Sequence, residues 1–149
     1  MSRLHIDTLD TSSTPLVDSC VTLLFNAFAS PELYGTQRLA EELRDAPPPF
    51  YRQFFIAVVA GEIVGIGGIK AADWASHTHL LYLSAVAPSH RRQGIGRRLV
   101  EARLDWVMQQ FPHGRILLSS AKARRFRELG FAPVARSGID GRQLMLRRF

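Results

Sequence analysis

The sequence has a single cysteine, no long apolar run and few acidic residues, and these scarcities exclude several classes of protein. Cys20 cannot form an internal disulfide, and its helical spacing among apolar residues is typical of a small core residue. The longest apolar run, residues 54–60, is far too short to span a bilayer. The first fifteen residues lack the apolar segment of a signal peptide. We therefore expect a cytoplasmic protein that does not enter a membrane.

The remaining composition is that of an ordinary globular domain. The 149 residues are 46% hydrophobic and 21% charged, which is typical of a chain that buries its own core. No repeat, long linker or change of composition divides the chain, so we expect one domain over residues 1–149. The formal charge of +6 raises the hypothesis of nucleic-acid binding, but no reader motif or aromatic-interleaved basic stripe is present. A polyanionic cofactor is the alternative cause of the positive charge.

Hydrophobic periodicity and turn residues predict a protein of the α/β or α+β class in the order β-α-α-β-β-β-α-β-α-β-β. Thr14 is the expected N-cap of the first helix, and Gly61 is the expected turn of a hairpin. Gly65, Gly67 and Gly68 indicate a bulge or a close backbone approach. The expected strands cover residues 4–8, 53–60, 62–70, 78–87, 116–118, 131–135 and 143–146. The expected helices are a first one that starts at Pro15 and includes Phe28, a second over about 36–44, a third over about 94–110, and a last one that Ser119 or Ser120 caps and that stops at Gly130.

The most informative segment is a basic loop with two glycines, residues 91–96, between a strand and a helix. Free N–H groups at a helix start form an anion site, which the helix dipole strengthens. Gly94 and Gly96 let the backbone approach a ligand, and curled amides make a nest for phosphate oxygens. A P-loop is excluded because no Gly-Lys-Ser/Thr follows, and a dinucleotide fingerprint is excluded because its third glycine position is Leu99. We predict a phosphate-binding loop; the alternative is a helix start with solvated arginines.

Two motifs resemble the GNAT superfamily of N-acetyltransferases. Residues 86–96 read Val-x-Pro-x-x-Arg-x-x-Gly-x-Gly, similar to the acetyl-CoA motif of that family, and residues 126–131 resemble its late Tyr-x-x-x-Gly-Phe. The resemblance implies a mixed, mostly antiparallel central sheet with helices on both faces. It also implies acetyl transfer from acetyl-CoA to a primary amine of a small molecule or peptide, without a covalent enzyme intermediate and without a metal.

The resemblance further implies which residues contact the cofactor. The family's strand splays from its neighbour after a bulge, so the backbone of Ser84, Ala85 and Val86 is expected to pair with the pantetheine arm. The amide of Val86 is expected to polarise the thioester carbonyl. Leu99 is expected to be a core contact. The amides expected to hold the pyrophosphate are those of Arg91, Arg92, Gln93, Gly94, Ile95, Gly96 and Arg97.

The chain departs from the family at the residue that often protonates the leaving thiolate. The family has a tyrosine there, and this chain has Phe126, which cannot donate a proton. Ser119 or Ser120 is the expected substitute, although both are also typical N-cap residues. The departure leaves a second hypothesis open, a CoA-binding or structural module with impaired catalysis. The acceptor and the choice between monomer and homodimer stay open.

For the general base, the resemblance indicates the strand that precedes the pantetheine contacts, which carries His79 and Tyr82. Tyr82 has the strand parity of Ser84 and Val86, so it faces their side unless a bulge intervenes. His79 has the better intrinsic pKa for the task. Surface or packing roles are the alternatives for both. Three aromatic residues are candidates for the wall of an acceptor pocket, with packing in the core or a loop as the alternative: Phe28, Tyr34 and Trp74.

Overall fold

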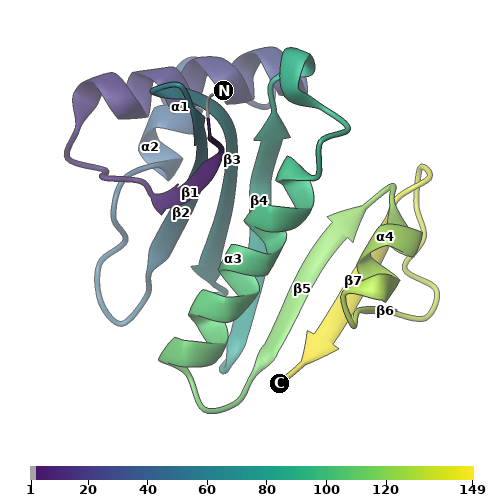
Figure 1. The fold of residues 1–149 in the computed structure, drawn as a ribbon. Coiled ribbons are helices and arrows are strands. Elements are labelled where there is room, and N and C mark those ends of the chain that lie inside the picture. The colour runs from purple at the N-terminus through teal and green to yellow at the C-terminus, as the bar shows by residue number, and fades with distance from the viewer. Residues whose placement is uncertain (1–2) are drawn as a thin grey trace.

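The structure, a computed structural model, describes residues 3–149 as one sheet flanked by helices (Figure 1). The strands are β1 (His5–Thr8), β2 (Arg52–Val59), β3 (Glu62–Ala71), β4 (Thr78–Val86), β5 (Arg115–Ser120), β6 (Ala132–Pro133) and β7 (Gln143–Arg148). The helices are α1 (Thr14–Phe28), α2 (Thr36–Glu42), α3 (Ile95–Gln110) and α4 (Ala123–Glu128), and a 3₁₀ turn, η1, covers Pro88–His90. The element order predicted from the sequence is confirmed.

The sheet is mixed and mostly antiparallel, as expected. Its strands lie in the order β1-β2-β3-β4-β5-β7-β6, and only the β4–β5 pair is parallel. Helices α1 and α2 pack on one face and α3 and α4 on the other, so the sheet separates two apolar cores. Cys20 and Leu99 are buried in these cores, as predicted. Within residues 3–149, the helices are too short or too polar to cross a membrane.

Local chemistry sets most of the boundaries near their predicted positions. The β2–β3 hairpin turns at Ala60 and Gly61, which have the left-handed φ angles of 53° and 76°. The N-cap of α1 is Ser13, because its hydroxyl accepts a hydrogen bond from the Leu16 amide at 3.4 Å. The prediction that Thr14 is the cap was therefore wrong by one residue.

The start of α4 differs more from the prediction. Ser119 and Ser120 belong to β5, and α4 begins at Ala123 without a side-chain cap. The strand is longer than its short apolar run indicates, because it pairs with β7 as far as Ser120 opposite Gln143. The Ser120 hydroxyl still accepts a hydrogen bond from the Lys122 amide at 2.9 Å, so it supports the turn that leads into α4.

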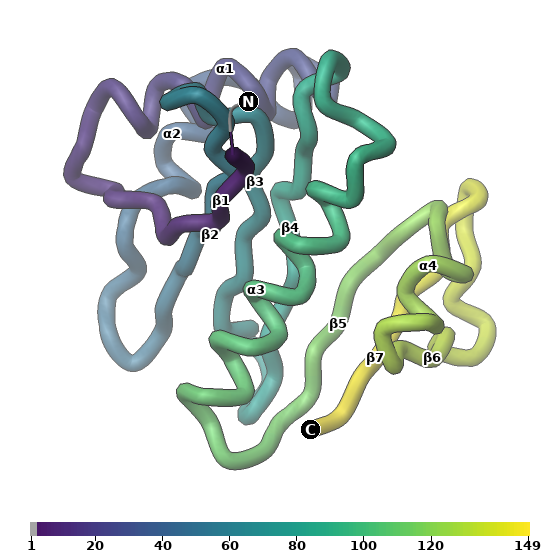
Figure 2. Tube along the Cα trace, in the orientation of Figure 1, coloured from purple at the N-terminus to yellow at the C-terminus, as the bar shows by residue number. Residues whose placement is uncertain are grey.

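Strands β4 and β5 are paired only at their first residues. Residues 78–80 lie opposite residues 115–117, and beyond them the two strands diverge (Figure 2). From Leu81 to Val86 the edge of β4 that faces β5 has no strand partner in the part of the chain that the structure describes, residues 3–149. Exposed strand groups of this kind are ready to pair with another extended chain.

A bulge interrupts β4 within this unpaired stretch. Two residues of β4, Leu83 and Ser84, lie opposite one residue of β3, Gly67, and Leu83 has a left-handed φ of 49°. The bulge that the glycines of β3 indicate is thus confirmed. It places Tyr82 with the α1–α2 core, whereas Ser84 faces α3, so the parity expected of these two residues does not hold.

Candidate functional site

The divergence of β4 and β5 opens a cleft through the sheet. Its volume is about 1680 Å³, which is larger than the ~300–1,000 Å³ typical of sites for drug-sized ligands. The unpaired edge of β4 forms one wall and the end of β5 the opposite wall. The start of α3 and one side of α4 flank the cleft on one face of the sheet, and α1 and α2 flank it on the other.

The loop before α3 curls at one end of the cleft. Arg92 and Gly94 both have left-handed φ angles, 62° and 78°, and Gly94 is the N-cap of α3. The first helical hydrogen bond there runs from the Arg98 amide to the Gly94 carbonyl at 3.1 Å, so the preceding amides have no helical acceptor. Curled backbone ahead of free helix amides is the arrangement that binds anions.

Gly96 leaves space in front of these amides. A Cβ atom built at Gly96 would meet only the Cγ2 atom of Val86, at an ordinary 3.9 Å. The protein itself therefore does not require glycine here, and a larger side chain would extend into the cleft. Of the residues expected to contact the cofactor, the structure places all but Gln93 in the cleft lining: Ser84, Ala85, Val86, Arg91, Arg92, Gly94, Ile95, Gly96 and Arg97.

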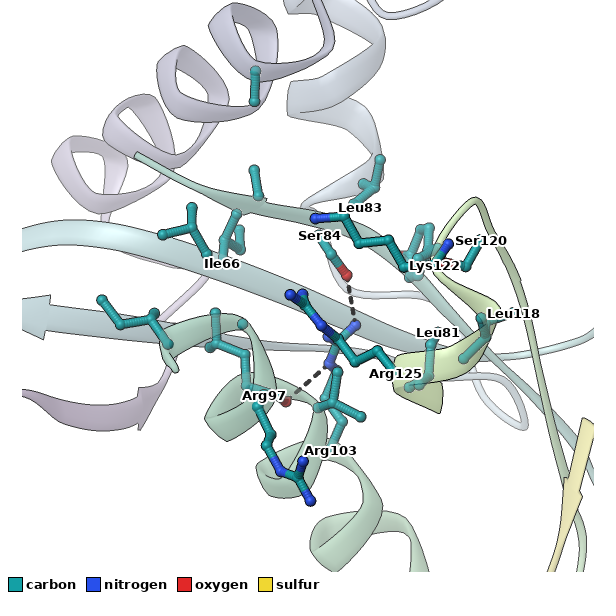
Figure 3. A pocket seen from close by; sticks show the side chains of 18 of the residues that line it. Ile66, Leu81, Leu83, Ser84, Arg97, Arg103, Leu118, Ser120, Lys122 and Arg125 are labelled. Carbon is teal, nitrogen blue, oxygen red and sulfur yellow. Dashed lines mark hydrogen bonds between the residues drawn. The ribbon is translucent and has the colours of Figure 1, made fainter. Parts of the chain in front are cut away.

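The cleft is strongly electropositive. Its lining holds ten arginines and lysines but two carboxylates, and both carboxylates are ion-paired, Glu42 with Lys70 and Glu128 with Arg97. Figure 3 shows Lys122 and Arg125 pointing into it from the α4 side. Such a surface favours a polyanionic ligand. The lining cations are Arg38, Lys70, Arg91, Arg92, Arg97, Arg103, Lys122, Arg124, Arg125 and Arg142.

The three residues considered for thiolate protonation all line the cleft on its β5–α4 side. The hydroxyl of Ser119 is exposed and accepts a hydrogen bond from Arg142 Nε at 3.2 Å, which leaves its own hydrogen free to donate. Ser120 is buried and bonds the Lys122 amide. The Phe126 ring packs edge-on against Phe131, with centroids 5.7 Å apart.

His79 does not line the cleft. Its imidazole is buried among the rings of Tyr51, Phe111 and Phe149, and its Nδ1 atom lies 2.6 Å from the Tyr51 hydroxyl. Burial lowers the pKa of His79, and the nearby charge of His77 lowers this pKa further. The bulge in β4 comes after Tyr82 rather than between His79 and Tyr82, so it does not turn this imidazole toward the cleft.

Tyr82 lines the cleft on the α1–α2 side. Its hydroxyl is buried and, among residues 3–149, forms no hydrogen bond of ordinary geometry, while the Lys70 ammonium lies 4.5 Å from the centre of its ring. Burial raises the pKa of Tyr82, and the Glu42 carboxylate raises this pKa further. The phenol is therefore protonated at neutral pH and can donate or relay a proton, but it cannot act as a direct base.

The sequence does not predict the charged cluster around Glu42, because its members come from three separate elements, α2, β2 and β3. The Glu42 carboxylate lies 2.8 Å from Lys70 Nζ and 3.7 Å from Arg52 Nε. Burial tends to raise the pKa of Glu42, but the hydrogen bond and charge of Lys70 and the charge of Arg52 outweigh burial and lower it. The aromatic residues beside this cluster in the cleft are Phe28 and Tyr34, whereas Trp74 is 66% exposed and outside the lining.

Comparison with known proteins agrees with these features. A model of the acetyltransferase (GNAT) family matches residues 19–131. The fold resembles Escherichia coli ElaA, with a TM-score of 0.80 and 16% identity over 97% of this chain and 99% of that chain. It also resembles the PaiA N-acetyltransferase of Thermoplasma acidophilum in complex with coenzyme A, with a TM-score of 0.71 and 14% identity over 99% of both chains.

A third similar structure is the ribosomal-protein-S18-alanine N-acetyltransferase of Escherichia coli, with a TM-score of 0.73 and 19% identity over 98% of this chain and 94% of that chain. At these identities the structural likeness shows the fold. No curated protein matches the sequence. Within residues 3–149, no group of three or more His, Cys, Asp or Glu side chains is placed to hold a metal ion.

Proposed function

The chain belongs to the acetyltransferase (GNAT) family, an acyltransferase family that uses acyl-CoA, and on that premise we propose that it transfers an acetyl group from acetyl-CoA to a primary amine. The observation that carries the proposal is the unpaired edge of β4, which ends at the curled amides before α3. An extended pantetheine arm suits that edge, and a pyrophosphate suits those amides. The cationic lining of the cleft supports a polyanionic donor.

In the proposed binding mode, the backbone of Ser84, Ala85 and Val86 pairs with the pantetheine arm. The amides of residues 91–97 hold the pyrophosphate, and the left-handed backbone at Arg92 and Gly94 curls them around it. The Val86 amide polarises the thioester carbonyl.

The amine attacks the thioester carbon directly. A C–N bond forms, the C–S bond breaks, its electron pair leaves on sulfur, and the amine nitrogen loses a proton. Cys20 is not suited to form a covalent intermediate, because it is fully buried in the α1 core and burial raises the pKa of its thiol to about 12. In this proposal Tyr82 relays the amine's proton to solvent, and Ser119 donates a proton to the leaving sulfur and regains one from water.

The charges of the cleft also restrict the acceptor. The compartment between α2 and Tyr82 contains Arg38, Lys70 and Glu42, and this one carboxylate is already paired with Lys70. A polyamine carries several ammonium groups, which this compartment would repel. We therefore propose an acceptor with one amine and no further positive charge, whose apolar part lies against Phe28 and Tyr34.

A turnover assay tests the proposed function. Thiol release from acetyl-CoA is measured with matched amines, such as an amino acid, the same compound without its carboxylate, and a polyamine. We expect thiol release with a monoamine, weaker release with the polyamine, and an amide product in the mass spectrum. Binding of acetyl-CoA without release for any amine would support the alternative of a catalytically impaired module instead.

Phe126→Tyr is expected to preserve turnover or raise it. The substitution adds a hydroxyl in the cleft wall, at the position where the family often has its acid. Steady-state kinetics and thermal unfolding of both proteins are the measurements. A large loss of turnover with unchanged stability would show instead that Phe126 is a required apolar wall of the acceptor site.

A further inference from the structure

Arg103 is a cation buried in the core of the protein. It lies on α3 four residues after Leu99, on the helix face that packs against the sheet, and it is 1% exposed. Gly67 makes room for it, because a Cβ atom there would lie 2.6 Å from the Arg103 Cζ atom. Arginine side chains are nearly always exposed in proteins, whereas here the glycine of β3 opposite the β4 bulge leaves space for a buried one.

The guanidinium is held by oxygen atoms that carry no full charge. Its Nη1 atom donates to the Ser84 hydroxyl at 3.0 Å (Figure 3). The same atom donates to the Gly68 carbonyl at 2.9 Å, and the Nε atom donates to the Leu99 carbonyl at 3.0 Å. Among residues 3–149 it makes no ion pair with a carboxylate. Burial lowers the pKa of Arg103 to about 9, so the group stays positive at neutral pH.

An unpaired charge in the core destabilises a protein, and apolar replacements of buried charges are often neutral or stabilising. The presence of this cation in the core is explained if a negative charge reaches it during function. Arg97, Lys122 and Arg125 beside it along the cleft are also positive, and the two carboxylates of the cleft lining, Glu42 and Glu128, are already paired with Lys70 and Arg97. We therefore expect the negative charge to come with a ligand.

Ser84 connects Arg103 to the cleft. The side chain is exposed and lies in the bulge on the unpaired edge of β4. Because its oxygen accepts a hydrogen bond from Arg103, its own hydrogen is free to be donated into the cleft. Hydrogen bonds reinforce one another in such chains, so the guanidinium strengthens the hydroxyl as a donor.

We propose that Arg103, acting through the Ser84 hydroxyl, stabilises the thiolate of CoA as it leaves. The inference rests on the proposed function, in which Ser84 lies beside the pantetheine arm. When the C–S bond breaks, its electron pair stays on sulfur as a negative charge, and the Ser84 O–H donates a hydrogen bond to that sulfur. The proton that completes the thiol comes from Ser119, the donor named in the proposed function. Arg103 is thus a positioning residue, and Ser84 is the group that touches the leaving atom.

The thiol of bound CoA reports on this interaction directly. Its titration is followed by thiolate absorbance in the complexes of wild type, Arg103→Met, Arg103→Lys and Ser84→Ala with CoA. Arg98→Met is the matched control, because Arg98 is an exposed arginine of the same helix outside the cleft lining. Desulfo-CoA, which has no thiol, measures binding without the sulfur.

We expect the thiol pKa to be higher in Arg103→Met than in wild type by about one to three pH units, the range typical of a nearby opposite charge. Ser84→Ala should also raise the thiol pKa, and Arg103→Lys should raise this pKa less than Arg103→Met does. Arg98→Met should leave the thiol pKa unchanged. Turnover should fall about tenfold or more in Arg103→Met with an unchanged KM for acetyl-CoA. Desulfo-CoA affinity should stay equal in all variants.

An identical thiol pKa in wild type, Arg103→Met and Ser84→Ala would overturn the inference, even if the enzyme turns over normally. Loss of desulfo-CoA affinity together with turnover would assign Arg103 a structural role and overturn it too. If Arg103→Met does not fold, Ser84→Ala and Arg103→Lys decide by the same titration. Failure of wild type to bind CoA at all would instead contradict the proposed function.

Discussion

In Gly96→Glu, acetyl-CoA binding is expected to be lost while the fold is kept. The new side chain would extend from the start of α3 into the cleft, where the proposed pyrophosphate lies against free helix amides. It adds both bulk and a negative charge at that point. The affinity should fall about a hundredfold or more, which is about 2.8 kcal/mol at 1.4 kcal/mol per factor of ten. Calorimetric titration with acetyl-CoA measures this loss.

Two further variants separate the causes of that loss. A Cβ atom at Gly96 meets only Val86, at 3.9 Å, so Gly96→Ala should unfold at the wild-type temperature and bind more weakly than wild type. In Gly96→Gln the new side chain has nearly the size of the one in Gly96→Glu but no charge. The affinity of Gly96→Gln for acetyl-CoA should therefore lie between those of Gly96→Ala and Gly96→Glu. Wild-type affinity in Gly96→Glu would contradict the assignment of this loop to the pyrophosphate.

In Tyr82→Phe, turnover is expected to fall about a hundredfold, the low end of the ~10²–10⁴ typical of acid–base groups, with little change in acetyl-CoA binding. The reason is the proposed relay of the amine's proton through this hydroxyl. The stability of the fold should change little, because the buried hydroxyl forms no hydrogen bond of ordinary geometry among residues 3–149. Stability and turnover should therefore change independently.

Tyr51→Phe is the matched control for this result. Its hydroxyl is also surrounded by protein, but it lies 2.6 Å from His79 Nδ1 and outside the cleft lining. Its removal should lower the free energy of unfolding by about 1–3 kcal/mol and leave turnover unchanged. Equal turnover in Tyr82→Phe and wild type would remove the hydroxyl from the mechanism and leave solvent to take the proton.

The fold and the loop before α3 were predictable because their signals are local. Apolar periodicity and turn residues gave the element order, and Gly94 at the start of a helix marks an anion site within a few residues of sequence. The glycines of β3 likewise indicated a bulge. Boundaries that depend on pairing with a strand far away in sequence could not be predicted as well. Ser120, for example, belongs to β5 because it pairs with Gln143 of β7.

The wrong parity of Tyr82 and Ser84 has the same kind of cause. An alternating strand places them on one face, but the extra residue at Leu83 puts them on opposite faces. The glycines reveal that a bulge exists, while its position in β4 depends on how β3 and β4 align. A one-residue change of register reverses every assignment beyond it.

The sequence places Arg103 on a buried helix face, but only the fold shows what surrounds its charge. It follows Leu99 by four residues, so helical periodicity alone puts it on the apolar face of α3. What compensates the buried charge depends on Gly67, Gly68 and Ser84, which come from two strands far away in sequence. The Glu42–Lys70 pair likewise joins residues 28 positions apart.

A crystal structure of the protein with CoA tests the central claim most directly. We predict that the pyrophosphate lies on the amides of residues 91–97 and that the pantetheine arm runs along the unpaired edge of β4 beside Ser84 and Val86. The thiol should then lie in the cleft between β4 and β5, within hydrogen-bond reach of the Ser84 hydroxyl. CoA bound elsewhere on the surface, or a cleft closed by pairing of β4 with β5 along its whole length, would contradict the claim.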